Sequence, residues 1–460
     1  MQITKTDVFW NYGATFLRIA SSVMLFPFIL RMMPSETVGI WTVFMTITAF
    51  AGLLDFGFNG SFTRNVTYIF SGVKNLKTNG FETVDKKDLA IDYGLLKGVI
   101  SAMRWFYSRI AIVLFLILIT LGTYYLHTLL QNYKGDQQEV YIAWGLLCII
   151  STYNLFTLYY DSLLQGKGLV KRSKQIVIVG QTVYLIIAAI LIIKGNGIVA
   201  IVSAQASSVI IVRWLSYRSF FTKEIKQNLH DSIPRAKKEI LKAITPNAVK
   251  IGLTSLGGFM VQRSAIVIGS LYLTLNDIAS YGITIQLIGI IAGLAGIYTA
   301  TYQPQIAQLR VSHNKQAIKE LYLKGQIIIL LTYLAGGIGL LIFGEWALNF
   351  VGSKTLLMAP NLVFLTLILS FEQTNLITAG GILLTRNEVP FFKASLISGF
   401  SIVIGLLISL NYTGKGIYCL ILVPLFVDIS YSAWKWPLQV INELKITTSN
   451  YINTFKNLKI

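Results

Sequence analysis

The chain has 460 residues, of which 54% are hydrophobic and only 13% are charged. Soluble globular proteins carry about 25% charged residues, so this composition excludes an ordinary soluble domain and indicates an integral membrane protein. The formal net charge of +19 would suggest nucleic-acid binding in a soluble protein. Here its meaning depends on where the basic residues fall along the chain.

Twelve apolar stretches recur along the sequence. Each is long enough to cross the hydrocarbon core of a bilayer, which takes about 20 residues of helix. Seven contain no charged residue, and five are interrupted by a single ionisable residue. The sequence therefore predicts an all-α integral membrane protein with about 12 transmembrane helices. In chain order the stretches are residues 8–30, 37–63, 110–133, 140–160, 175–193, 195–212, 251–276, 278–309, 325–344, 355–385, 394–414 and 416–434.

The basic residues concentrate in alternate loops. With both termini placed in the cytoplasm, the cytoplasmic segments hold 31 Lys and Arg residues and the external segments hold five. Such an asymmetry is the positive-inside pattern of membrane proteins. We therefore expect a multi-pass protein of the bacterial cytoplasmic (inner) membrane with both termini cytoplasmic. Its basic loops would face membrane lipids, and we expect no nucleic-acid partner.

A polar, basic segment near the midpoint divides the chain into two halves. We predict an N-terminal six-helix bundle over residues 1–222, a basic cytoplasmic linker over 223–245 and a C-terminal six-helix bundle over 246–460. A faint repeat favours this division, because Glu36-Thr-Val-Gly-Ile-Trp41 opens the second stretch much as Asn276-Asp-Ile-Ala-Ser-Tyr-Gly282 opens the eighth. Transporters are commonly built from duplicated bundles. Chance is the alternative explanation for so short a match.

Two arginines lie inside predicted helices, Arg18 in the first stretch and Arg263 in the seventh. Insertion scales give a cation near the bilayer centre a penalty of roughly 2.5–3.5 kcal/mol, so such a residue faces a cavity or a partner. Because the planar guanidinium binds phosphate through two parallel hydrogen bonds, we predict that both arginines bind an anionic substrate group. The alternative is structural ion pairing, of Arg18 with Asp55 and of Arg263 with Glu372 or Asp428.

Three carboxylates also lie within predicted helices: Asp55, Glu372 and Asp428. Buried carboxylates gain proton affinity and bind hard cations, so each is a candidate for coupling transport to a proton or sodium ion. Glu372 is the first choice, because amide and hydroxyl side chains flank it. For Asp55 the preferred interpretation is local capping and packing in an Asp-Phe-Gly sequence. The three histidines are isolated, so we expect no metal centre and no bound cofactor.

Several segments resemble the polysaccharide and O-antigen flippases of the multidrug/oligosaccharidyl-lipid/polysaccharide exporter superfamily. These flippases have a proline-containing first helix, a short loop ending in Gly-x-Trp and an aspartate-glycine pair late in the second helix. The matching segments are Phe26-Pro-Phe-Ile-Leu-Arg-Met-Met-Pro-Ser-Glu-Thr-Val-Gly-Ile-Trp41, Leu53-Leu-Asp-Phe-Gly-Phe-Asn-Gly60, Leu164-Gln-Gly-Lys-Gly168 and Tyr302-Gln-Pro-Gln305.

The resemblance implies two pseudo-symmetric six-helix bundles around a V-shaped central cavity. It also implies a function, moving undecaprenyl-pyrophosphate-linked oligosaccharide repeat units from the cytoplasmic to the outer leaflet by alternating access. The expected partners are the lipid-linked oligosaccharide and glycan-assembly proteins. Members commonly have a cationic cavity. Arg18 and Arg263 suit it by their positions in the chain, although neither matches an invariant motif.

Two other functions compete with this one. An ion-coupled exporter of small solutes would share the superfamily, but the two arginines would repel the cationic drugs that multidrug exporters carry. A membrane glycan polymerase or ligase would need catalytic residues on a sizeable external loop. No predicted external loop exceeds roughly fifteen residues. We therefore expect a transporter rather than an enzyme.

Overall fold

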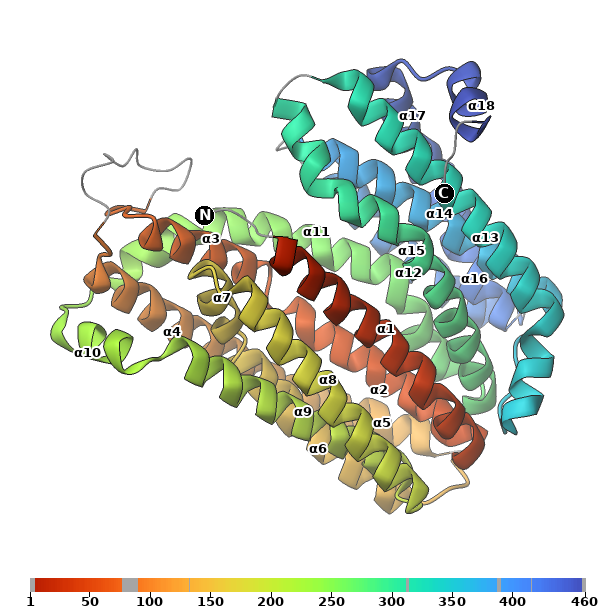
Figure 1. Cartoon of the computed structure of the whole chain (residues 1–460). Coiled ribbons are helices and arrows are strands. Elements are labelled where there is room, and N and C mark those ends of the chain that lie inside the picture. The colour runs from red at the N-terminus through yellow and green to blue at the C-terminus, as the bar shows by residue number, and fades with distance from the viewer. Residues whose placement is uncertain are drawn as a thin grey trace. The chain divides into compact units, whose positions relative to one another are not determined.

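The structure is a computed structural model that describes residues 5–76, 90–131, 133–311, 314–386, 390–414 and 416–456. Some side chains of the first helix and of two long central helices fall outside this description. Every regular element among the described residues is helical (Figure 1). The chain forms two compact units: unit 1 comprises residues 1–37 and 43–256, and unit 2 comprises residues 38–42 and 257–460.

Unit 1 contains the first ten helices, except residues 38–42 of the second, and the start of the eleventh. Its closest helix neighbours are α8 with α9, α1 with α8, α3 with α7 and α6 with α9. A π-helical turn, Leu118–Gly122, joins α4 to α5. The helices are α1 (Lys5–Met32), α2 (Ser35–Leu53), α3 (Phe58–Phe70), α4 (Tyr93–Ile117), α5 (Thr123–Leu130), α6 (Gln137–Phe156), α7 (Tyr159–Gly166), α8 (Val170–Ile193), α9 (Gly197–Phe220), α10 (Lys223–Asp231) and α11 (Lys237–Tyr272).

Unit 2 contains the remaining helices. In it α12 packs against α13 and α14, and α14 also packs against α17. A second π-helical turn, Asp428–Ser432, joins α16 to α17. The helices are α12 (Leu275–Val311), α13 (Lys315–Val351), α14 (Pro360–Leu384), α15 (Phe392–Tyr412), α16 (Ile417–Val427), α17 (Ala433–Leu444) and α18 (Thr448–Lys456).

The predicted helical membrane architecture is confirmed. Among the described residues, ten helical stretches are long and apolar enough to cross a membrane. The two remaining predicted stretches correspond to α1, with 28 residues, and α11, with 36 residues. Local sequence sets several boundaries, since the Asp92 carboxylate accepts a hydrogen bond from the Leu95 amide at the start of α4 and Pro360 opens α14.

Two predicted helices are broken in the structure. The stretch 37–63 becomes α2 and α3, separated by Phe56 at φ 47° and Gly57 at φ 70°. Left-handed backbone of this kind ends a helix, and only glycine adopts it without strain. The stretch 140–160 likewise becomes α6 and the start of α7. Apolar periodicity alone cannot reveal such breaks, because both sides of each break remain apolar.

Within unit 1, the helix ends that carry basic residues lie together. Lys167 lies over the ring of Phe220, Arg172 donates to the Ser219 hydroxyl at 3.2 Å, and Lys97 donates to the Ser232 carbonyl at 2.7 Å. These contacts join the start of α4, the α7–α8 turn, the end of α9 and the α10–α11 turn.

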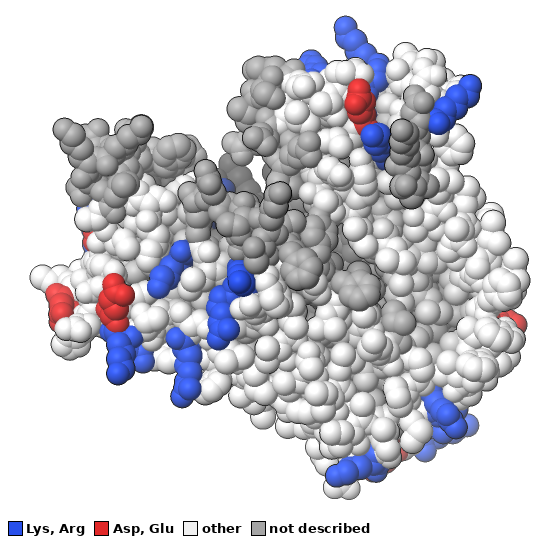
Figure 2. All heavy atoms as spheres, viewed as in Figure 1, with Lys and Arg blue, Asp and Glu red and all other residues white. Residues whose placement is uncertain are grey.

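At the opposite end of unit 1, the Glu36 carboxylate accepts a hydrogen bond from the Lys134 amide, and Glu139 accepts one from the Val199 amide. These contacts join the starts of α2, α6 and α9. The side of the membrane that the basic helix ends face stays a prediction. On the face shown in Figure 2, Lys and Arg gather near helix ends, with a wide uncharged surface between them.

The predicted basic linker, residues 223–245, is largely helical. It contains α10 and the first turns of α11, and it docks on α4 through the 2.6 Å ion pair between Arg235 and Asp92. The two compact units divide further along, between Leu256 and Gly257 of the continuous helix α11. The bundle boundaries 1–222, 223–245 and 246–460 stay a prediction, as does the V-shaped cavity.

Candidate functional site

Arg263 lies in α11 and is partly buried. It forms no ion pair or hydrogen bond within the described part of the chain, and its guanidinium lies within electrostatic reach of the Tyr281 hydroxyl of α12. The alternative in which Arg263 pairs with Glu372 or Asp428 is therefore not observed. A cation left without a partner in an apolar helix remains available to an anion. Arg18 lies in α1, and its side chain falls outside the described residues.

Glu372 and Asp428 are brought together in unit 2. Glu372 lies in α14, and Asp428, only 1% exposed, opens the π-helical turn after α16. The two carboxyl groups act directly on each other. Both oxygens of Glu372 are buried, and no described residue donates a hydrogen bond to them. Asp428 accepts a 3.4 Å bond from Gln373.

This arrangement is unusual because two acidic groups, which would carry like charges if both were ionised, lie together in an apolar interior. Two adjacent carboxylates are stable only if a proton or a cation lies between them. A further oxygen, Oδ1 of Asn375, is also buried without a donor one turn along α14 from Glu372. The group supplies carboxylate and amide oxygens, which hard cations prefer. It fits the predicted coupling of Glu372 and Asp428 to a proton or sodium ion, which remains a prediction.

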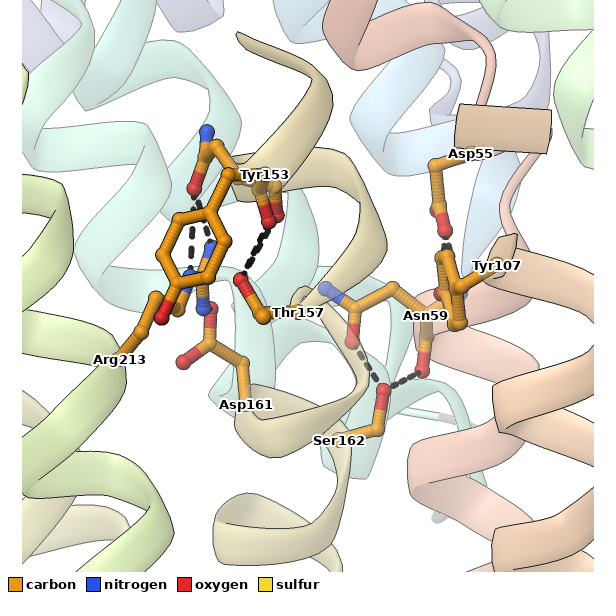
Figure 3. Close-up of polar contacts among 9 residues, drawn as sticks. Asp55, Asn59, Tyr107, Tyr153, Thr157, Asp161, Ser162 and Arg213 are labelled. Atoms are coloured by element: carbon orange, nitrogen blue, oxygen red, sulfur yellow. Dashed lines mark hydrogen bonds and ion pairs between the residues drawn. The ribbon is translucent and has the colours of Figure 1, made fainter. Parts of the chain in front are cut away.

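Asp55 has a different environment (Figure 3). It is 9% exposed and lies in the turn between α2 and α3. Its carboxylate accepts a 2.5 Å bond from the Tyr107 hydroxyl, and its two oxygens share the backbone N–H of Asn59, each at 3.1 Å. Asp55 makes no ion pair among the described residues. It thus fixes the first turn of α3 to α4, while its predicted part in coupling stays a prediction.

A neighbouring network joins α6, α7 and α9 and was not foreseen from the sequence. Arg213 of α9 is 5% exposed and forms a 2.8 Å ion pair with Asp161 of α7. It also donates two hydrogen bonds, at 3.2 and 2.7 Å, to the amide oxygen of Asn154 in α6 (Figure 3). Both charges lie just beyond the apolar stretches 195–212 and 140–160, where a charged residue gives no indication that it is buried. Arg213 and Asp161 lie far apart along the chain, so the sequence alone does not indicate that they form an ion pair.

This network borders a small cavity of about 80 Å³ between α2, α6 and α9. Thr48, Ser151, Asn154 and Gln205 contribute its polar lining, and the Ser151 hydroxyl is buried without a partner. A cavity of this size holds a few water molecules. It is too small for an oligosaccharide.

In unit 2, Glu443 of α17 forms ion pairs with both Arg310 of α12 and Arg386, which follows α14. Arg310 also donates to the Thr385 hydroxyl at 3.1 Å. The carboxylate is 15% exposed, so the cluster is partly shielded from water. The cluster stabilises the fold, because it joins the basic ends of α12, α14 and α17.

The fold identifies a class of protein. Comparison with protein-family models finds no match, and comparison with curated protein sequences likewise finds none. Solved structures do match. An inward-facing multidrug resistance MATE family transporter of the MOP superfamily has 16% sequence identity and a TM-score of 0.64, with 96% of each chain covered.

Two further structures extend the comparison. The lipid II flippase MurJ, in an inward closed conformation, has 12% identity and a TM-score of 0.65, covering 98% of this chain and 90% of MurJ. A MOP superfamily transporter from Pyrococcus furiosus, described as having a binding pocket of reverse polarity, has 17% identity and a TM-score of 0.52, covering 96% and 95%. The chain therefore has the fold of MOP superfamily transporters, which confirms the predicted resemblance at the level of the fold.

Proposed function

We propose that this protein is a flippase that moves undecaprenyl-pyrophosphate-linked oligosaccharide repeat units from the cytoplasmic to the outer leaflet of a bacterial inner membrane. The repeat units would serve assembly of a surface polysaccharide of the O-antigen or capsule type. The sequence resemblance to such flippases supports the proposal, and so does the fold shared with a lipid II flippase. The observation that supports it most is Arg263, a partly buried cation that forms no ion pair among the described residues.

The pyrophosphate is the part of this substrate that an arginine would recognise. A sugar unit linked through pyrophosphate carries a compact multiple charge that cannot cross hydrocarbon unaided. Arg263, together with Arg18, would donate paired hydrogen bonds to its oxygens during alternating access. The free energy of these hydrogen bonds would offset the cost of removing water from the pyrophosphate.

The carboxyl pair supplies a means of driving the cycle. If Glu372 and Asp428 hold one proton or a sodium ion, its loss leaves two adjacent negative charges that destabilise the state in which they face each other. A conformational change that separates or hydrates them would then be favoured. Coupling of this kind needs no nucleotide.

Export of a small solute is the competing function. The fold also occurs in multidrug transporters of the MATE family, and a cation-binding carboxyl pair would serve an exporter equally well. The unpaired Arg263 favours an anionic cargo over a cationic one. The two functions differ in what accumulates when transport stops.

The test uses a host strain that lacks this gene. The strain should accumulate lipid-linked oligosaccharide in its membranes and lose surface glycan, and the wild-type gene should restore both. Arg263→Ala should lower glycan export about 10- to 100-fold at normal protein abundance, since each hydrogen bond to a charged group contributes about 1.5–3 kcal/mol. Arg263→Lys should restore part of it, and Glu372→Gln should abolish dependence on a proton or sodium gradient.

The control is Arg31→Ala, because Arg31 is an exposed cation at the end of α1. It should export at the wild-type rate. A deletion strain with no accumulated lipid-linked sugar would overturn the flippase proposal and favour the exporter. Full glycan export by Arg263→Ala would show that Arg263 does not hold the pyrophosphate.

A further inference from the structure

Trp105 on the outer face of α4 is contacted by two cations. Its indole is 39% exposed, and the Arg109 guanidinium lies 5.2 Å from the ring centroid. The Lys237 ammonium, from the start of α11, lies 5.4 Å from the same ring. Attraction between cations and the ring face holds both charges beside one aromatic surface. All three residues belong to unit 1.

Neither cation has an acidic partner in the part of the chain that the structure describes. Other cations nearby are engaged: Arg235 pairs with Asp92, Arg104 donates to the Tyr159 hydroxyl, and Lys97 donates to backbone carbonyls. Arg109 and Lys237 therefore flank one indole ring as two positive charges, and neither forms an ion pair among the described residues. An anion that reaches both would be attracted by both charges.

The surface next to these cations is apolar. Beyond Arg109, Ile112 and Leu116 of α4 and Ile119 of the π-helical turn that follows α4 are 57%, 56% and 47% exposed. Ile112 and Leu116 are four residues apart, so they lie on one face of α4. Together with Ile119 they form an exposed apolar stripe. The stripe begins near the basic helix ends of unit 1 and continues along a helical stretch that is long and apolar enough to cross a membrane. Tryptophan, arginine and lysine at such a boundary are typical of the membrane interface.

We propose that this stripe, Trp105, Arg109, Lys237, Ile112, Leu116 and Ile119, binds one anionic phospholipid of the leaflet that faces the basic helix ends. The lipid phosphate would lie beside the Trp105 ring and would pair with Arg109 and Lys237. An acyl chain would lie along Ile112, Leu116 and Ile119. A free phosphate ion would use only the first half of this surface, which is why the occupant is a lipid.

The site also joins two segments that are far apart in the chain. Arg109 belongs to α4, whereas Lys237 opens α11, the helix that carries Arg263. A lipid bound by both cations would fix the start of α11 against α4. The composition of the membrane would then influence a helix that leads into unit 2.

The test is native mass spectrometry of the purified full-length protein in detergent, titrated with phosphatidylglycerol or with phosphatidylcholine. The wild-type protein should retain phosphatidylglycerol in preference to phosphatidylcholine. Arg109→Gln with Lys237→Gln should weaken phosphatidylglycerol binding about tenfold or more, because each basic residue near a membrane surface contributes about a factor of five. Trp105→Leu should weaken it as well, since the ring no longer holds the two cations.

The matched control is Lys238→Gln with Lys242→Gln, which removes two exposed cations from the same helix without touching the ring. It should bind phosphatidylglycerol like the wild type. Equal loss in the control would show that net charge alone attracts lipid and would overturn the proposal. Unchanged binding by the Arg109 and Lys237 double variant would do so too, and full displacement of the lipid by millimolar inorganic phosphate would identify a free-anion site instead.

Discussion

At the scale of single residues, buried charges in this protein are held in two ways. Arg213 is paired with Asp161 and also bonded to Asn154, so its charge is fully compensated. Arg263 has no such partner among the described residues, and Glu372 faces another carboxyl group. The compensated charge of Arg213 stabilises the fold. Arg263 and Glu372 are uncompensated, and we infer that a ligand or an ion completes their sites.

The Arg213 pair gives a prediction about stability. The Arg213 side chain is 6% exposed and that of Asp161 is 27% exposed. Removing one partner therefore leaves the other charge unpaired, and the two remaining charges differ in how deeply they are buried. Asp161→Ala leaves the more deeply buried cation and should destabilise the protein by about 3–5 kcal/mol. Arg213→Ala should destabilise it less, because water can reach the remaining carboxylate. Thermal unfolding of the purified variants in detergent measures the difference.

The Asp161→Ala, Arg213→Ala double variant serves as the control for that comparison. It removes both charges and should be more stable than Asp161→Ala alone, since no buried charge remains unpaired. A double variant whose loss equals the sum of the two single losses would contradict the idea that the residues act as a pair.

At the scale of elements, composition and spacing predicted the helices well and their interruptions poorly. Long apolar stretches must form helices in a membrane, because every backbone polar group there needs an internal partner. That constraint fixes where helices exist. It does not fix the turn at Phe56 and Gly57. There the Asp55 carboxylate accepts the Asn59 backbone N–H, and the Tyr107 hydroxyl donates to the same carboxylate.

Gly57 allows a direct test of that turn. It adopts φ 70° before α3, so Gly57→Ala places a side chain in the left-handed region and should destabilise the protein by about 1–2 kcal/mol. Gly60→Ala is the matched control. Gly60 lies inside α3 with open space around the position of a Cβ atom, so its replacement should stabilise the helix by about 0.5–1 kcal/mol. Opposite shifts in melting temperature are expected, and a loss at both positions would contradict the role given to the turn.

The candidate site could be predicted only in part, for the same physical reason. Glu372 and Asp428 stand out as charges in apolar stretches, and the structure brings them together. That Arg213 pairs with Asp161, or that Lys237 reaches Trp105, depends on which helices pack side by side. Periodicity within one helix carries no information on that choice, so these contacts needed the folded structure.

At the scale of the whole molecule, the alternation of basic loops predicts that both termini and the segment around α10 face the cytoplasm. The grouping of basic helix ends within unit 1 agrees with this alternation.

Single cysteines test the predicted orientation by reaction with a membrane-impermeant maleimide added to intact cells. Positions 230 and 456 should stay unlabelled until the cells are opened, whereas positions 134 and 354 should react from outside. All four native side chains are exposed, so access depends on the side of the membrane. The two native cysteines, Cys148 and Cys419, are 3% and 5% exposed and should give little background. External labelling at position 230 or 456 would reverse the orientation, and the proposed direction of transport would have to be reversed with it.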